Sequence, residues 1–225
     1  MSQILEKLYD HRRSNSWATK LRKKRLSLLK SLITSVPTPL KILDIGGKQA
    51  FWENAAFFNQ ELKGLEIILL NLDPEQVTVT HPSFQGVVGT ATDMKQFADN
   101  SFDVVFSNSV IEHVGDYNAQ RQMANEVMRV GKRYFVQTPN LYFPVEPHFV
   151  FPFFQFLPIS FRVWLLTHFD LGWMKKVTDK QEARRYVTSI RLLNKQELIN
   201  LFPDAKLYEE KLFGLNKSLI VYGGW

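Results

Sequence analysis

The sequence has 225 residues, 45% of them hydrophobic, and a formal net charge of +6 at pH 7. This length suits one α/β domain with a sizeable core, or one domain with a small elaboration. The chain has no cysteine, which excludes disulfides, thiolate nucleophiles and cysteine-based zinc sites, and no other metal ligand set is assigned.

The first 36 residues are predicted to be helical, ending at the prolines of "SVPTPL". Their opening, "MSQILEKLYDHRRS", lacks a signal-peptide pattern, so we expect a cytoplasmic protein. Much of the positive charge lies in residues 11–30. This stretch is either the solvated face of an amphipathic helix or a contact with anionic lipid or nucleic acid. If the stretch is an amphipathic helix, the side chains expected to face the core are Trp17, Leu21, Leu28 and Leu32.

Apolar strands and helical stretches then alternate, which predicts a parallel sheet covered on both faces. Strands are expected within residues 40–46, 65–73, 84–93, 101–110 and 132–140, and helices within 48–62 and 116–130. In such sheets ligands bind beyond the carboxyl ends of the strands. Polar residues gather at those ends: Asp44 to Gly47, Asn71 to Asp73, Asp93, and Asn108 to His113.

Residues 142–173 are dense in aromatic side chains, and Pro152, Pro158 and Arg162 make this stretch too interrupted to span a membrane. It is interpreted as the wall or lid of a ligand pocket, or as a helical pair packed on the sheet edge. A lid could also touch a membrane surface, together with the basic N-terminal segment.

Residues 178–202 are predicted to be helical, with Asn194 and Glu197 as a capping box. Two strands, within 205–214 and 216–224, form an antiparallel hairpin. The expected organisation is a single domain with four parts. These are N-terminal helices (1–36), a core (37–141), the aromatic insertion (142–193), and a final helix with the hairpin (194–225).

The turn after the first strand reads "DIGGKQAFW". Gly46 permits a sharp turn and a close approach to a ligand, and Asp44 can hold loop amides or receive a ligand's ammonium group. Lys48 and Ala50 break the G-x-G-x-x-G spacing of a nicotinamide-type fingerprint.

The stretch "GTATDMKQFADNSFDVVFSNSVIEHV" resembles the motif G-D-A-x-x-L-P-F-x-D-x-S-F-D-x-V-x-x-x-x-x-x-E-H. That motif belongs to small-molecule S-adenosylmethionine-dependent methyltransferases with a Rossmann-like fold. The match runs through Gly89, Asp93, Phe97, Asp99, Ser101, Phe102, Asp103, Glu112 and His113. The likeness is close over about 38–140 and extends to 194–225 in topology. It implies a seven-stranded, mostly parallel sheet with a C-terminal antiparallel hairpin and an insertion after the fifth strand.

The resemblance implies that S-adenosylmethionine is the cofactor. Asp44, Gly46 and Gly47 would lie against its methionine part, and Asn71, with Asp73 nearby, would hold the ribose. Leu72 would face the adenine, Asp93 and the Met94 backbone would bind its edge, and Asn108 and Ser109 would line the sulfonium. Asn71 stands where the family has an acid.

Methyl transfer needs mainly positioning and water exclusion, so no strict catalytic constellation is expected. The first candidates for a general base are His113 and His148. Glu112, Glu146 and Tyr142 are the next candidates. His113 is alternatively a helix-capping or loop-packing residue, and His148 alternatively faces the substrate without acting as a base, or does not face it.

The predicted function is methyl transfer to a small, lipophilic or aromatic acceptor, with no specific nucleic acid as partner. A non-catalytic scaffold that kept the fold is the alternative, and Lys48 in a glycine position favours it. An RNA methyltransferase is disfavoured, because "SNSV" follows the fourth strand where (Asn/Asp)-Pro-Pro-aromatic is usual.

Overall fold

The computed structural model describes residues 17–54 and 64–225. The predicted helices before Trp17 and the predicted helical stretch after Asn54 lie outside the described residues. The helices are α2 (Trp17–Ile33), α3 (Gln49–Asn54), α4 (Tyr117–Val130), α5 (Ile159–His168), α6 (Lys180–Thr188) and α7 (Lys195–Leu201). The strands are β1 (Leu40–Ile45), β2 (Leu65–Asn71), β3 (Phe84–Val88), β4 (Val104–Asn108), β5 (Tyr134–Pro139), β6 (Val145–Glu146), β7 (Phe151–Pro152), β8 (Lys206–Leu212) and β9 (Leu215–Gly223). Short 3-10 helices are η1 (Pro74–Val77), η2 (Ile111–His113) and η3 (Phe154–Phe156).

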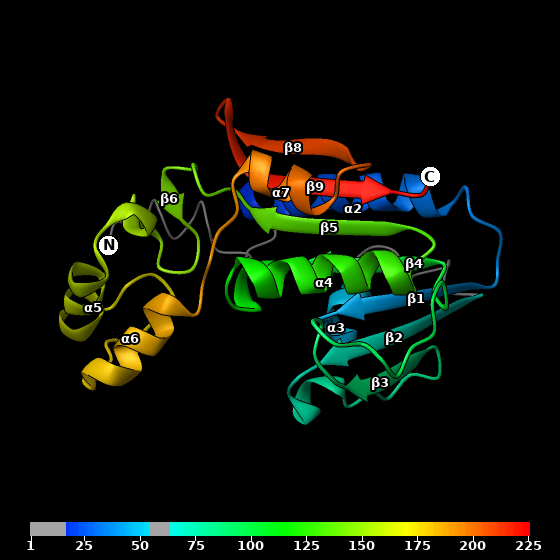
Figure 1. Ribbon diagram of the computed structural model, residues 1–225, viewed down its shortest axis with the longest axis horizontal. Coiled ribbons are helices and arrows are strands. Elements are labelled where there is room, and N and C mark those ends of the chain that lie inside the picture. Colours follow the sequence, from blue (N-terminus) through cyan, green and yellow to red (C-terminus); the bar gives the residue numbers. More distant parts are fainter. Residues whose placement is uncertain (1–16, 55–63) are drawn as a thin grey trace.

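Seven strands form one sheet in the order β3-β2-β1-β4-β5-β9-β8 (Figure 1). Strands β1 to β5 pair in parallel, while β9 runs antiparallel to both β5 and β8. The predicted Rossmann-like sheet with a C-terminal hairpin is therefore confirmed. The order reverses between β1 and β4, and such a switch point is where ligands bind in open α/β sheets.

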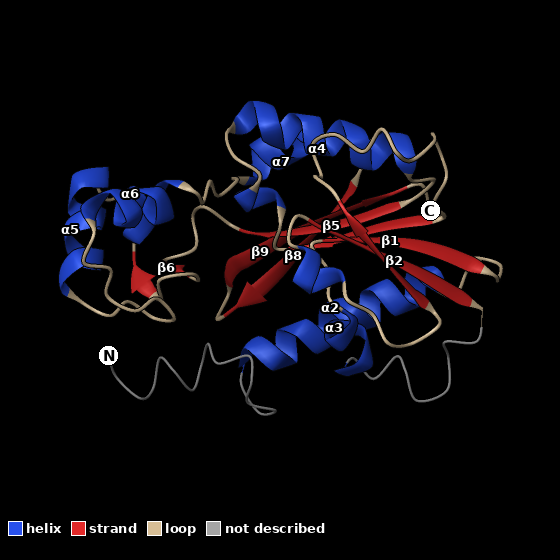
Figure 2. Ribbon diagram, turned by 90° about the horizontal axis from the view of Figure 1, so that it is seen from below, coloured by secondary structure: helices blue, strands red, loops and turns tan. Residues whose placement is uncertain are grey.

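Helices cover both faces of the sheet, with α4 and α7 on one side and α2 and α3 on the other (Figure 2). The first face packs buried residues such as Leu43, Val105 and Val127, and the second packs Ile42, Phe106 and Leu29. Adjacent strand positions alternate between the two cores, because successive side chains of a strand point to opposite faces. The capping box at the start of α7 is present as predicted.

Helix α2 buries a cation on the face predicted to be apolar. Leu21, Leu29 and Ile33 are buried as an apolar stripe, but Arg25 lies in the same stripe and is only 8% exposed. The description of the whole basic stretch as a solvated face is thus wrong for Arg25, because this guanidinium has a buried carboxylate partner. Leu28 and Leu32 pack partly buried against the core, and the side chain of Trp17 lies outside the described residues.

The insertion forms its own small core instead of packing its helices on the sheet edge. Phe149, Phe154, Leu166 and Val187 belong to a separate buried cluster, in which α5 and α6 pack together. Figure 1 places α5, α6 and β6 beyond the end of the sheet at which β5 ends. The two chain ends of the insertion run side by side, since the Leu141 amide donates to the Leu193 carbonyl at 3.0 Å.

Large aromatic side chains remain exposed on this insertion. Phe161 and Trp164 stack with ring centroids 5.5 Å apart, and Tyr142 stacks on Phe156 at 6.2 Å. Over the described residues, no helix has the length and apolar character needed to cross a membrane. The contact with a membrane surface stays a prediction.

Candidate functional site

The turn after β1 requires both of its glycines. Gly46 has a φ of +70°, and a Cβ there would lie 2.6 Å from Val110 Cγ2. A Cβ on Gly47 would lie 1.8 Å from Asp44 Oδ2. Protein atoms therefore crowd the Cβ side of the turn, while both glycines stay half-exposed. The backbone of this turn can approach a ligand from its open side.

Asp44 is buried beneath this turn. Its Oδ2 accepts a hydrogen bond of 2.6 Å from Trp52 Nε1. Burial raises the pKa of Asp44 to about 8, although the Trp52 hydrogen bond opposes the shift. A nearby ligand cation would lower this pKa again, because an opposite charge favours the ionised form.

The tip of β2 carries Asn71, Leu72 and Asp73. Leu72 is 72% exposed, and Asn71 Oδ1 accepts from the Asp73 amide at 3.3 Å. Asp73 caps η1, since its Oδ1 accepts from the Glu75 amide at 2.9 Å. The Asp73 carboxylate thus has a structural use at the position predicted to contact a ribose.

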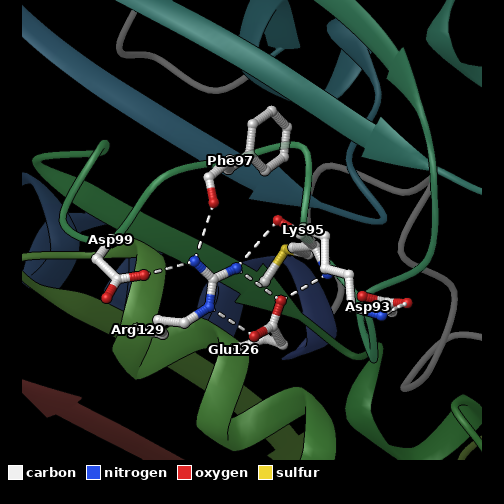
Figure 3. A network of polar contacts seen from close by, with 7 residues as sticks. Asp93, Lys95, Phe97, Asp99, Glu126 and Arg129 are labelled. Carbon is white, nitrogen blue, oxygen red and sulfur yellow. Dashed lines mark hydrogen bonds and ion pairs between the residues drawn. The ribbon is translucent and has the colours of Figure 1, made fainter.

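An ion-pair network holds the loop after β3 against α4 (Figure 3). Arg129 Nε and Nη2 donate to the two Glu126 oxygens at 2.7 and 2.8 Å, and Nη1 donates to Asp99 at 2.7 Å. The Met94 amide donates to Glu126 at 2.5 Å, so this predicted backbone donor already has a partner. Asp93 is exposed and pairs with Lys95 at 3.0 Å.

Arg25 ties the tip of β4 to α2 and the hairpin. Its Nη2 and Nε donate to the Glu210 carboxylate at 2.8 and 3.2 Å. Its Nη1 donates to Asn108 Oδ1 and, at 2.8 Å, to Gln137 Oε1. Ser109 Oγ donates to the same Gln137 oxygen at 3.0 Å. Asn108 and Ser109, predicted to line the methyl donor, are thus held by one network.

The insertion brings His148 against His113. The Nε2 atoms of the two rings are 3.1 Å apart, and His148 Nδ1 lies 2.6 Å from Glu146 Oε1. Glu146 is itself fixed, because its Oε2 accepts from the backbone amides of His148 and Phe149 at 2.8 Å. The two candidate bases predicted from separate motifs therefore form one cluster.

Glu112, the neighbour of His113 in η2, is the third side chain of this cluster. It is fully buried, and its Oε2 accepts from Thr138 Oγ1 at 3.0 Å while Oε1 has no hydrogen-bond partner. Ligand atoms of Glu112, His113 and His148 all lie within 4.8 Å of one another. Two imidazoles and a carboxylate at this spacing could also receive a divalent cation, a possibility the sequence did not indicate.

The neighbours in the cluster shift one another's pKa. Burial raises the pKa of Glu112 to about 7, and burial together with the charge of His148 lowers the pKa of His113 to about 4. Burial alone would lower the pKa of His148, but the hydrogen bond and charge of Glu146 outweigh it, so this pKa is raised. At neutral pH His113 is therefore uncharged, and it lies beside the more basic imidazole of His148.

Glu112→Gln is expected to stabilise the protein at neutral and alkaline pH. The folded pKa of Glu112, about 7, lies above its ordinary value of 4.5. The unfolded chain therefore releases this proton first, and the wild type loses stability as the pH rises from 4.5 to 7. Glutamine keeps an acceptor for Thr138 but cannot ionise.

Above pH 7 the variant's free energy of unfolding should exceed that of the wild type by on the order of 3 kcal/mol. Urea titrations at about pH 4.5 and about pH 8, on either side of this window, measure the difference. A difference that is the same at both pH values would contradict the assignment.

Several residues that shape the site were not predicted. Arg25, Glu210 and Gln137 form the network at the β4 tip, and Arg129 with Glu126 holds the loop after β3. The signal for Arg25 was its spacing of four residues from Leu21 and from Leu29, which places a cation in the apolar stripe. Gln137 stands out as an amide side chain in the strand "YFVQTP", which is fully buried.

Comparison with known proteins agrees with this architecture. Residues 43–134 match the family model described as a methyltransferase domain. An uncharacterized protein of Mycobacterium tuberculosis (strain H37Rv) is 35% identical over 66 residues, which are 29% of this chain and 22% of the relative. The matched stretch thus spans about a fifth of that relative's length.

Solved structures share the fold at low identity. A protein of Pyrococcus horikoshii aligns with a TM-score of 0.52 and 18% identity, covering 99% of this chain and 98% of its own. A S-adenosylmethionine-dependent methyltransferase of Methanosarcina mazei gives a TM-score of 0.50, 15% identity, and coverage of 85% and 94%. A phosphoethanolamine N-methyltransferase of Haemonchus contortus was solved with phosphomonomethylethanolamine and S-adenosylhomocysteine. It aligns with a TM-score of 0.52 and 18% identity, covering 83% of this chain and 38% of its own.

Proposed function

We propose that this chain, which belongs to the S-adenosylmethionine-dependent methyltransferases of Rossmann-like fold, transfers a methyl group to a small lipophilic or aromatic acceptor. The observation that carries the proposal is the arrangement of three strand tips within the matched residues 43–134. The turn after β1 lies at the switch point of the sheet, between the tips of β2 and β4. This is the crevice in which an open α/β sheet binds a nucleotide-like ligand.

The residues in this crevice fit the cofactor. Gly46 and Gly47 give a half-exposed backbone turn, buried Asp44 offers a carboxylate for an ammonium group, and Asn71 stands at the ribose position. Leu72 and Asp93 are exposed on the adenine side. When bound there, S-adenosylmethionine supplies an already activated methyl group, so the protein has to position the acceptor and exclude water.

His113 and His148 are proposed as the proton-accepting pair. Glu146 orients His148 through its Nδ1, and His148 in turn faces His113 Nε2. A neutral His113 can take a proton from an acceptor, and the more basic His148 can share it, since carboxylate-oriented imidazoles act in this way. Such a pair matters only for acceptors that start protonated.

The exposure of Lys48 disfavours the scaffold alternative. A lysine filling the cofactor crevice would have supported a protein that kept the fold and lost the chemistry. Its side chain is exposed, and Gly46 and Gly47 beside it stay partly exposed, so Lys48 does not bury the turn.

Calorimetric titration with S-adenosylhomocysteine tests the proposal. We expect saturable binding by the wild type, and the same dissociation constant for His148→Gln, because this side chain is assigned to the acceptor side. No heat and no thermal shift at millimolar ligand, with a correctly folded protein, would overturn the proposed function.

A further inference from the structure

A cavity lies at the carboxyl ends of β4 and β5, between α2 and β9. Its volume is about 280 Å³, enough for a small organic molecule. One part of its wall is apolar and consists of Pro139, Phe143, Pro147 and Trp173. A second part is cationic and consists of Arg22, Arg25 and Lys217, and the remaining lining residues are polar and uncharged.

The charges around this cavity do not balance. Arg25 is neutralised by its two hydrogen bonds to Glu210. Among the described residues, the structure gives the side chains of Arg22 and Lys217 no hydrogen bond and no ion pair. Placing like charges together in a partly buried space is unfavourable unless an anion joins them.

The pKa values of both groups reflect this imbalance. Burial lowers the pKa of Arg22, and the positive charge of Arg25 lowers it further. Burial also lowers the pKa of Lys217, and repulsion from Arg25 and Arg22 adds to the effect, while Glu210 opposes it. An anion in the cavity would relieve both shifts.

The cavity reaches the proposed reaction centre, because Asn108 and Ser109 belong to its wall. We propose that it binds the methyl acceptor through a carboxylate or phosphate group, held by Arg22 and Lys217, with the acceptor's apolar body against Phe143. This inference rests on the proposed function and narrows it from any lipophilic acceptor to an amphiphilic acid.

The anion could instead be the carboxylate of the cofactor itself. The two sources are separable, since 5′-methylthioadenosine has the nucleoside and sulfur of S-adenosylhomocysteine but no carboxylate. If Arg22 and Lys217 held the carboxylate of the cofactor, their substitution would weaken the binding of S-adenosylhomocysteine. The affinity for methylthioadenosine would stay unchanged.

The test uses the full chain saturated with S-adenosylhomocysteine, titrated with benzoate, inorganic phosphate or methyl benzoate. We expect benzoate or phosphate to bind and the neutral ester not to bind. The double variant Arg22→Gln/Lys217→Gln should weaken anion binding by about tenfold or more. The matched control is Lys24→Gln, an exposed cation on the same helix, which should leave it unchanged.

Three results would overturn the inference: no anion binding, equal anion affinity in the double variant, or loss of S-adenosylhomocysteine affinity with methylthioadenosine unaffected. The proposed function fails separately. In that case the wild type would not bind S-adenosylhomocysteine, whereas benzoate or phosphate titrated alone would still report on the cavity.

Discussion

Gly47→Ala is expected to abolish measurable binding of S-adenosylhomocysteine and to destabilise the fold. The added Cβ would lie 1.8 Å from Asp44 Oδ2 and 2.1 Å from its Cγ. Neither group can move aside easily, since Asp44 is buried and bonded to Trp52. Overpacking of this kind costs about 1–3 kcal/mol of stability. The turn must shift to relieve the clash, and its backbone then no longer faces the ligand in the same conformation. Calorimetry measures the affinity, and urea denaturation measures the stability.

Gly214→Ala is the matched control. Gly214 also has a positive φ, of +80°, but an added Cβ there meets nothing within 4 Å. Its cost should be limited to backbone strain of about 1 kcal/mol, with cofactor affinity unchanged. Wild-type affinity in Gly47→Ala would contradict the assignment of this turn to the cofactor.

Arg25→Met is expected to cost about 3–5 kcal/mol in the free energy of unfolding. The substitution leaves the Glu210 carboxylate, 1% exposed, without its bidentate partner. It also releases Asn108 and Gln137 at the tip of β4. The double variant Arg25→Met/Glu210→Met should recover part of the loss, because the unpaired Glu210 carboxylate is removed, although Lys217 then loses the attraction of Glu210.

Urea denaturation of the two single variants and the double variant measures this coupling. Lys24→Met, on the exposed face of α2, should change stability by about 0.5 kcal/mol or less. If Arg25→Met lowered the free energy of unfolding no more than Lys24→Met does, the buried pair of Arg25 and Glu210 would contribute little to stability.

The sheet could be predicted from the sequence because its signals are local. Runs such as "LEIILLN" are apolar on both faces, and this pattern is typical of central parallel strands. The positions of Asp44, Asn71 and Asn108 at strand ends followed from the same runs, since parallel strands end at one edge of the sheet.

The contacts that complete the site are not local. Arg25 and Glu210 are 185 residues apart, and without the partner a cation in a basic stretch is most simply assigned to solvent. The contact between His113 and His148 depends on the conformation of the insertion. Val150 and Phe153, with φ values of +48° and +54°, turn the chain there in a way that residue type does not indicate.

The neighbouring ends of the insertion have an evolutionary consequence. Since Leu141 and Leu193 are hydrogen-bonded to each other, the intervening segment leaves and re-enters the sheet domain at one point. It also has a hydrophobic cluster of its own. Segments of different length and shape can therefore be exchanged at this junction without altering the strands that carry Gly46 and Asn71. Exchange of this segment would thus replace Glu146 and His148 while the turn after β1 stays the same.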